Sequence, residues 1–247
     1  MRAKISSKYR LTLPEKIEMI KMSVRAVTRG YKMSRLVIGV PGIGKSKATL
    51  DALEDEGAKI VLIQGGIKNA RTMYTTLYDN NDKAIIIVFD DVNSIFMNKD
   101  TAEILRIAVS NDKVRRITYN DNNMAKLRGL YEPSFEFKSK VIMITNVPKG
   151  RIDKAILSRT SAIEITASKK EIADYVFQNM EAAPPEQIPL KWKKDIFEFI
   201  TSELKLANVA RFDFRVFEDC CLWYAANVSK NGRVSPDWKK HVTTILT

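Results

Sequence analysis

The chain has 247 residues, of which 45% are apolar and 28% charged, and its formal net charge is +12 at pH 7. This composition excludes a disordered protein, and no apolar run is long enough to span a bilayer, so we expect a soluble cytoplasmic protein without a membrane partner. The two cysteines, Cys220 and Cys221, are adjacent, a spacing that suits neither a disulfide framework nor a metal site. The positive charge favours a polyanionic partner, most often nucleic acid.

Along the chain, the pattern changes twice. Residues 1–35 are strongly basic, and Pro14 with the apolar spacing after it predicts a helix there. Uninterrupted apolar runs then alternate with helical patterns, which is typical of a parallel sheet covered by helices on both faces. Beyond a proline-rich linker, "EAAPPEQIP", only helical patterns remain. We therefore predict an α/β core over residues 36–167 and a small all-helical domain over residues 168–247.

A phosphate-binding pattern follows the first apolar run. The letters "GVPGIGKS" fit G-x-x-x-x-G-K-S and lie between an expected strand and an expected helix, the context that a P-loop requires. Its glycines let backbone N–H groups face phosphate oxygens, the lysine neutralises the phosphates, and the serine hydroxyl reaches Mg²⁺. The residues predicted to bind ATP are Gly39, Pro41, Gly42, Ile43, Gly44, Lys45, Ser46 and Lys47.

Two adjacent aspartates, Asp90 and Asp91, directly follow the apolar run over residues 85–89. Neighbouring carboxylates raise each other's pKa, and burying one without a partner is costly, so a metal ion would explain the pair. We predict that Asp90 holds Mg²⁺ together with Ser46 and that Asp91 polarises the attacking water. The alternative is that Asp91 only forms the turn after the strand.

Taken together, these motifs resemble those of AAA+ ATPases, over most of the chain. "GVPGIGKS" is similar to the Walker A motif and "IIIVFDD" to the Walker B motif, with Asp91 in place of the usual glutamate. The resemblance implies that Asn146 is the polar tip of a sensor 1 strand and that Arg159 is an arginine finger. It also implies a sensor 2 helix with Arg215, or alternatively Arg211, and makes the C-terminal helices a lid. Plainer interpretations are a strand end for the asparagine, and a surface position or an ion pair within a helix for the arginines.

An arginine finger acts on the nucleotide of a neighbouring subunit, so the resemblance further implies a homo-oligomer, a hexameric ring or spiral. The most basic internal segment, "RRITYNDNNMAKLRGL", predicts a loop or a hairpin with its bend at "NDNN". Helicases of the AAA+ and superfamily 3 kinds carry a pore insertion at this place, and cations with rings suit a single strand. We therefore predict DNA, preferably single-stranded, as the partner, although a solvated surface loop is an alternative. The predicted contacts are Lys68, Arg115, Arg116, Tyr119, Lys126 and Arg128.

Three functions stay open at this point. The favoured one is an ATP-driven DNA motor, a helicase or remodelling ATPase that DNA stimulates, and the compact chain, rich in lysine and asparagine, suggests a phage origin. The second is a loader that places a helicase or a sliding clamp on DNA. The third is a protein-remodelling ATPase whose basic surface is incidental, since AAA+ proteins share chemistry but not substrates.

Overall fold

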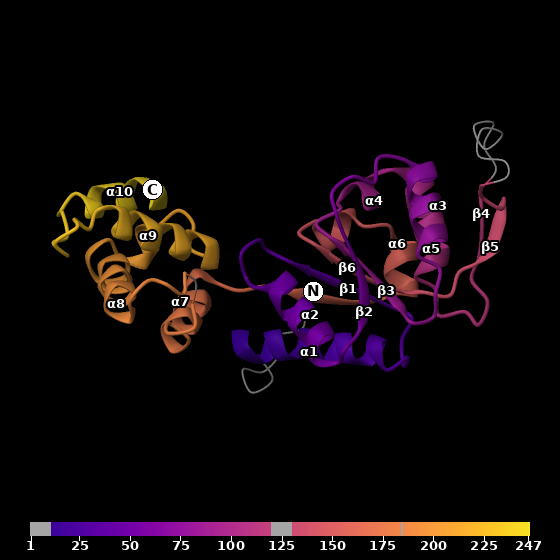
Figure 1. The fold of residues 1–247 in the computed structure, drawn as a ribbon, viewed down its shortest axis with the longest axis horizontal. Helices are drawn as coiled ribbons and strands as arrows, with labels where there is room; N and C mark the ends of the chain where they lie inside the picture. Colours follow the sequence, from indigo (N-terminus) through magenta and orange to yellow (C-terminus); the bar gives the residue numbers. More distant parts are fainter. Residues whose placement is uncertain (1–10, 120–129, 184) are drawn as a thin grey trace, which may run out of the picture. The chain divides into compact units, whose positions relative to one another are not determined.

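The computed structural model describes residues 11–119, 130–183 and 185–247, which form two compact units (Figure 1). The α/β unit consists of Ile17–Gly39 and Lys45–Ile165, and the C-terminal unit consists of Thr166–Thr247, Val40–Gly44 and the residues up to Lys16. The division at Thr166 lies close to the predicted boundary at residue 168. Most of the first helix groups with the α/β unit, and Val40–Gly44 of the phosphate loop, residues 39–46, groups with the C-terminal unit.

The α/β unit is built on a five-stranded sheet with the order β2-β3-β6-β1-β7. All four pairings between neighbouring strands are parallel, which confirms the prediction of a parallel sheet. The order places β6 between β1 and β3, so the strand before the phosphate loop and the strand that ends in the aspartate pair are separated by one strand. The strands are β1 (Ser34–Gly39), β2 (Lys59–Gln64), β3 (Ile85–Asp90), β6 (Lys140–Thr145) and β7 (Ser161–Ile165).

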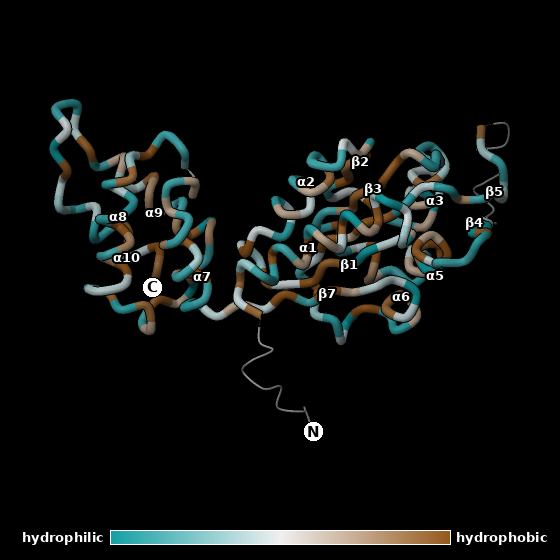
Figure 2. The backbone as a smooth tube through the Cα atoms, turned by 90° about the horizontal axis from the view of Figure 1, so that it is seen from below, coloured by the Kyte–Doolittle hydropathy of each residue, from teal (hydrophilic) through white to brown (hydrophobic). Residues whose placement is uncertain are grey.

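Helices cover both faces of this sheet, with α1 and α2 on one side and α3, α5 and α6 on the other (Figure 1). Leu36 and Ile38 belong to the buried cluster formed with the second group of helices, whereas Val37, between them, is buried on the opposite face. Both faces of the strands are thus apolar. Along the chain, the strands appear as hydrophobic stretches in Figure 2. The helices are α1 (Leu13–Thr28), α2 (Lys45–Asp55), α3 (Ala70–Asp79), α4 (Ser94–Met97), α5 (Lys99–Ala108) and α6 (Lys154–Arg159), with a 3-10 turn at Lys149–Arg151.

The C-terminal unit is helical, as predicted. Cys220 and Cys221 are free thiols in its interior, and burial raises the pKa of each to about 12. These cysteines therefore act as small apolar side chains of the core. The elements are α7 (Lys169–Gln178), α8 (Leu190–Glu198), a π-helical turn (Phe199–Glu203), a 3-10 turn (Leu206–Asn208), α9 (Phe214–Ala226) and α10 (Trp238–Leu246).

Within the α/β unit, the predicted hairpin is present as an antiparallel pair, β4 (Arg116–Thr118) and β5 (Ser134–Glu136). The returning strand lies further along the chain than the sequence suggested. Aromatic rings fix the pair to α3, since the Tyr74 ring lies 5.5 Å from that of Tyr119 and 5.2 Å from that of Phe135. The predicted bend at "NDNN", together with Lys126 and Arg128, lies outside the described residues.

Arg115 lies just before β4, and the structure places it where it cannot contact a nucleic acid. Its side chain is only 3% exposed, and its guanidinium lies 4.8 Å from the centre of the Phe137 ring. Nη1 donates to the carbonyl oxygen of Ala108 at 2.6 Å, and Nη2 donates to that of Ser139 at 2.8 Å. Burial lowers the pKa of Arg115 to about 10, so the side chain stays charged at neutral pH. The predicted DNA contact by Arg115 is therefore wrong, because this side chain holds the base of the hairpin. Arg116 is exposed and stays a candidate for DNA contact.

We predict that replacing each of these adjacent arginines by alanine has very different effects on the free energy of unfolding. Arg115→Ala leaves two buried carbonyl oxygens without a donor and should cost about 2–4 kcal/mol of unfolding free energy. Arg116→Ala, the matched control, should change stability by no more than about 0.5 kcal/mol. Urea unfolding of the two variants measures both values. Equal stabilities would contradict the structural role of Arg115.

Candidate nucleotide site

Polar side chains from two strands and one helix meet at the carboxyl edge of the sheet. The register pairs Gln64, the last residue of β2, with Asp90, the last residue of β3. Asp90 Oδ1 accepts a hydrogen bond from Ser46 Oγ at 2.8 Å, and Oδ2 accepts one from Gln64 Nε2 at 3.1 Å. The Asp90 side chain is only 7% exposed, so these donors compensate a buried carboxylate on both oxygens. Lys45, which precedes Ser46 in α2, is buried to the same extent.

The donor set around Asp90 suits Mg²⁺ better than a metal held by the protein alone. Within residues 11–119, 130–183 and 185–247, no group of three or more His, Cys, Asp or Glu side chains could hold a metal ion. Mg²⁺ needs only one or two protein oxygens when phosphates and water complete its shell. The Ser46 hydroxyl and the Asp90 carboxylate, 2.8 Å apart, supply such a pair.

The second aspartate is turned away from the first by its backbone. Asp91 has a φ of 55°, in the left-handed region, which aspartate tolerates better than most residues. Its N–H donates to the carbonyl oxygen of Ile144 at 3.0 Å, and its side chain is exposed. The two carboxylates therefore point to different environments, which limits the repulsion between them.

A side-chain network joins the loop after Asp91 to the end of β6. Asn93 Oδ1 accepts a hydrogen bond from Thr145 Oγ1 at 2.7 Å, and Asn93 Nδ2 donates to Asn146 Oδ1 at 3.2 Å. The amide of Asn146 is thereby held beside the loop that carries Asp91. Sequence reasoning missed Gln64 and Asn93. A polar residue at the end of an apolar run could have revealed the first, whereas the second reads as an ordinary turn residue.

The first half of the phosphate loop contacts the beginning of α9, within the C-terminal unit. Gly42 has a φ of 74°, and its carbonyl oxygen accepts a hydrogen bond from the N–H of Phe214 at 3.1 Å. A Cβ at Gly42 would lie 2.6 Å from Asp213 Oδ1, so both the backbone angle and the close approach require glycine. The loop is thus packed against α9.

The other residues predicted to bind ATP lie as follows. Pro41 is exposed and Ile43 is buried, so the isoleucine serves packing. Lys47 faces solvent and lies 3.5 Å from Asp51, one turn further along α2. Lys68, predicted to contact DNA, is exposed in the loop after β2.

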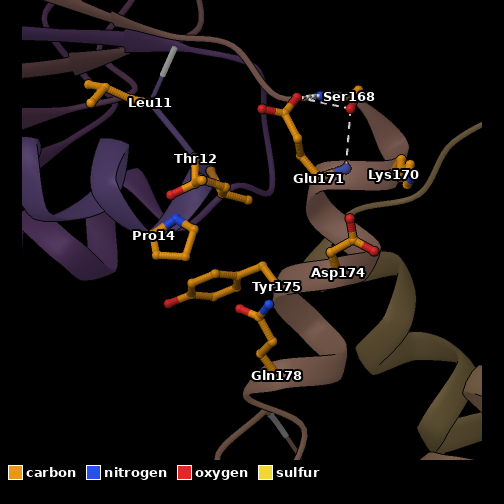
Figure 3. A pocket seen from close by; sticks show the side chains of 10 residues that line it. Leu11, Thr12, Pro14, Ser168, Lys170, Glu171, Asp174, Tyr175 and Gln178 are labelled. Atoms are coloured by element: carbon orange, nitrogen blue, oxygen red, sulfur yellow. Dashed lines mark hydrogen bonds between the residues drawn. The ribbon is translucent and has the colours of Figure 1, made fainter. Parts of the chain in front are cut away.

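A pocket of about 460 Å³ lies in the C-terminal unit, between residues 11–14 at the start of α1 and the length of α7 (Figure 3). The Tyr175 ring lies 5.4 Å from the Phe214 ring, and a Cβ at Gly44 would lie 3.8 Å from Phe214. The Phe214 ring thus lies between the pocket and the phosphate loop, and it meets the Tyr175 ring edge to face. Its lining residues are Leu11, Thr12, Leu13, Pro14, Ser168, Lys170, Glu171, Asp174, Tyr175 and Gln178.

An ion pair beside this pocket links α1 to α7. Lys16 Nζ lies 2.8 Å from Glu171 Oε1 and also donates to the carbonyl oxygen of Thr166 at 2.7 Å. Glu171 completes a capping box with Ser168 at the start of α7. The hydrogen bond from Lys16 and that from the Ser168 N–H lower the pKa of Glu171 to about 2.

Comparison with known structures identifies the fold. A Thermotoga maritima RuvB described as a Holliday junction branch migration motor superposes with a TM-score of 0.58 at 12% sequence identity, covering 94% of this chain and 69% of that one. A mutant of the same RuvB gives a TM-score of 0.57 at 14% identity, with 95% and 72% covered. The chain has the AAA+ fold. Identities this low show the fold alone.

Sequence comparisons add little to this assignment of the fold. No protein-family model matches the chain. An uncharacterized 36.7 kDa protein of enterobacteria phage T4, encoded between nrdC and mobD, is 25% identical over 135 residues. The match covers 53% of this chain and 41% of the phage protein.

Three arginines predicted from the AAA+ resemblance lie in different settings. Arg159 is exposed in the last turn of α6, where Nη1 donates to the carbonyl oxygen of Ala155 at 3.0 Å. Arg211 Nε lies 2.5 Å from Asp213 Oδ2, and Asp213 packs against the phosphate loop. Arg215 is exposed in the first turn of α9. Of these two arginines of the C-terminal unit, Arg211 is thus the one paired with a side chain that packs against the phosphate loop.

Because the pKa of Glu171 is lowered, we predict that the unfolding free energy of the C-terminal unit decreases at acid pH. Its folded pKa of about 2 lies below the ordinary value of 4.5, so the stabilisation is complete above pH 4.5 and is lost as the pH falls toward 2. Glu171→Gln should therefore flatten the decline of unfolding free energy over this pH window. Urea unfolding at a series of pH values measures the slope, with the exposed Glu186→Gln as the matched control. An unchanged slope for Glu171→Gln would show that the ion pair contributes nothing.

Proposed function

We propose that this protein is a Mg²⁺-dependent ATPase that acts on DNA as a motor, a helicase or a remodelling enzyme. The observation that carries the proposal is the contact between Asp90 and Ser46, which brings the carboxylate after β3 to the end of the phosphate loop. The AAA+ fold supports nucleotide binding. The similarity to a branch migration motor, the basic charge and the match to a phage protein support DNA as the substrate and a phage origin.

In the proposed reaction, each polar residue of the site has a separate task. Lys45 would neutralise the phosphates, and Ser46 and Asp90 would hold Mg²⁺, which would supply further positive charge there. Asp91 accepts a proton from water as the water oxygen bonds to the γ-phosphorus and the bond to the ADP oxygen breaks. Asn146, oriented by Asn93, donates a hydrogen bond to that water or to the γ-phosphate.

The pocket beside α7 is the proposed site for the nucleoside. Its volume of about 460 Å³ lies within the range of small-molecule sites. Tyr175 and Pro14 supply flat apolar surface, and the contacts through Phe214 connect the pocket with the loop that would hold the phosphates. Binding there would join the segment before α1, α7 and the phosphate loop in one event.

The two aspartates should separate binding from hydrolysis. Asp90→Asn removes the Mg²⁺ ligand and should weaken Mg²⁺-dependent ATP binding and hydrolysis together. Asp91→Asn removes only the proton acceptor, so ATP should bind normally and turnover should fall by about a hundredfold or more. Calorimetric titration and phosphate release measure the two effects.

Two further variants make this test decisive. Lys45→Ala should abolish binding, and Asp100→Asn, an exposed aspartate of α5, should change neither property. Near-normal ATP affinity of Lys45→Ala would overturn the site. Wild-type turnover of Asp91→Asn would reduce that residue to a turn former.

The exposed position of Arg159 supports a catalytic site that is shared between subunits of a ring or spiral, which we propose to be hexameric. Arg159→Ala subunits should bind ATP without hydrolysing it. Mixing them with Lys45→Ala subunits should restore part of the turnover, because some interfaces then combine an intact loop with an intact arginine. Arg151→Ala, exposed on the preceding 3-10 turn, is the control and should stay active alone. Absence of rescue in mixed assemblies of proven composition would contradict a finger that acts between subunits.

DNA contacts are proposed for Arg116 and Lys68, with Lys126 and Arg128 as further candidates outside the described residues. Replacing Arg116 and Lys68 by alanine should weaken binding of single-stranded DNA and flatten its salt dependence by about 0.7 per lost phosphate contact. Lys83→Ala, before the amino end of β3, is the control. Fluorescence anisotropy at several salt concentrations measures the slopes. Unchanged affinity and slope would place the DNA elsewhere.

The proposal as a whole is tested by ATP turnover with and without single-stranded DNA, duplex DNA and RNA. A motor should be stimulated by DNA and should displace a paired strand. A loader would bind DNA and turn over slowly without displacing it, and a protein remodeller would be indifferent to nucleic acid.

A further inference from the structure

The aspartate that begins α9 has features that helix capping does not require. Asp213 Oδ1 accepts a hydrogen bond from the N–H of Val216 at 3.0 Å, which is ordinary N-cap geometry. Serine, threonine or asparagine would cap the helix as well. Asp213 is nevertheless only 3% exposed, so its charge is held in a place where charge is costly.

Asp213 is buried against the phosphate loop. The Asp213 side chain lies so close to Gly42 that no other residue fits there, and the next residue, Phe214, donates its N–H to the Gly42 carbonyl oxygen at 3.1 Å. A fixed negative charge beside a loop that binds phosphates opposes the ligand unless a cation compensates it.

Arg211 is the compensating cation. Its Nε lies 2.5 Å from Asp213 Oδ2, and the arginine side chain is 59% exposed. A guanidinium has five N–H donors, so the contact through Nε leaves others that can turn to a second acceptor. Arg211 is therefore paired with a carboxylate that itself lies against the phosphate loop.

We propose that Asp213 is a positioning residue that competes with nucleotide phosphates for Arg211, an inference that rests on the proposed nucleotide binding. Without nucleotide, Asp213 holds Arg211 against the start of α9. With nucleotide, the phosphates draw Arg211 away from Asp213, and the hydrogen bond of Asp213 to the helix end remains. The carboxylate thus lowers nucleotide affinity and couples the state of the loop to α9.

The sign of one substitution tests this competition. Asp213→Asn keeps a side-chain oxygen for the Val216 N–H but cannot hold the guanidinium as an ion pair. The Kd for a non-hydrolysable ATP analogue with Mg²⁺ should fall by about tenfold, the change expected for roughly one charge-assisted hydrogen bond. A residue with a purely structural role would give unchanged or weaker binding, and either result would overturn the proposal.

A double variant separates competition for Arg211 from simple repulsion of phosphate by Asp213. In Arg211→Gln combined with Asp213→Asn, the affinity should be no higher than that of the wild-type protein, because no guanidinium is left to be released. A double variant that binds more tightly than wild type would overturn the competition and leave repulsion alone. Asp153→Asn is the matched control, since Asp153 also caps a helix and lies 2.7 Å from an arginine, Arg106.

Two measurements keep the outcome interpretable. Thermal unfolding of each variant shows whether the C-terminal unit is intact. The single variant Arg211→Gln breaks the ion pair without altering the helix cap. This variant should bind the ATP analogue more weakly than Arg233→Gln, which replaces an exposed arginine of the same unit. Wild-type protein that binds no nucleotide would refute the proposed function. Normal wild-type binding with no gain in Asp213→Asn would refute only the role of Asp213.

Discussion

The organisation of the sheet edge depends on the cost of burying the Asp90 carboxylate. An ion that is 7% exposed at the end of an apolar strand is stable only where donors reach both of its oxygens. Parallel pairing with β2 supplies Gln64, and the P-loop supplies Ser46 at the start of α2. The fold therefore brings the end of the phosphate loop and the Asp90 carboxylate together through the same hydrogen bonds that compensate the burial of that carboxylate.

The neighbouring carboxylate follows from this arrangement. If Asp91 continued the strand, its side chain would point to the opposite face of the sheet, into the apolar layer there. The left-handed φ of 55° and the hydrogen bond to Ile144 turn it toward solvent instead. The same turn brings Asn93 into contact with Thr145 and Asn146. The left-handed backbone of Asp91 thus places the side-chain amides of Asn93 and Asn146 beside each other at the end of the strands.

Residue pattern predicted the parts of the structure that depend on periodicity and on local backbone rules. The apolar runs predicted the parallel sheet, and the glycine spacing predicted the tight turn between β1 and α2, because both reflect short-range constraints. The sequence pattern could not show that Arg115 is buried and Arg116 exposed. The difference depends on the carbonyl oxygens of Ala108 and Ser139, which accept hydrogen bonds from Arg115 only in the folded chain. The role of Asn93 was hidden for the same reason, as its partners are more than fifty positions away.

The phosphate loop shows how long-range packing can act on a local motif. Gly42 would be expected from the motif alone, yet its surroundings add a second requirement, because Asp213 occupies the space of a side chain. The chain passes from one compact unit to the other at both ends of Val40–Gly44, and this segment groups with the helices of the C-terminal unit. A change in the loop would therefore reach α9 directly, through the contacts of Asp213 and Phe214 with Gly42. The proposed competition for Arg211 would give that mechanical link an electrostatic component, because the same phosphates that bind the loop would change the charge balance at the helix end.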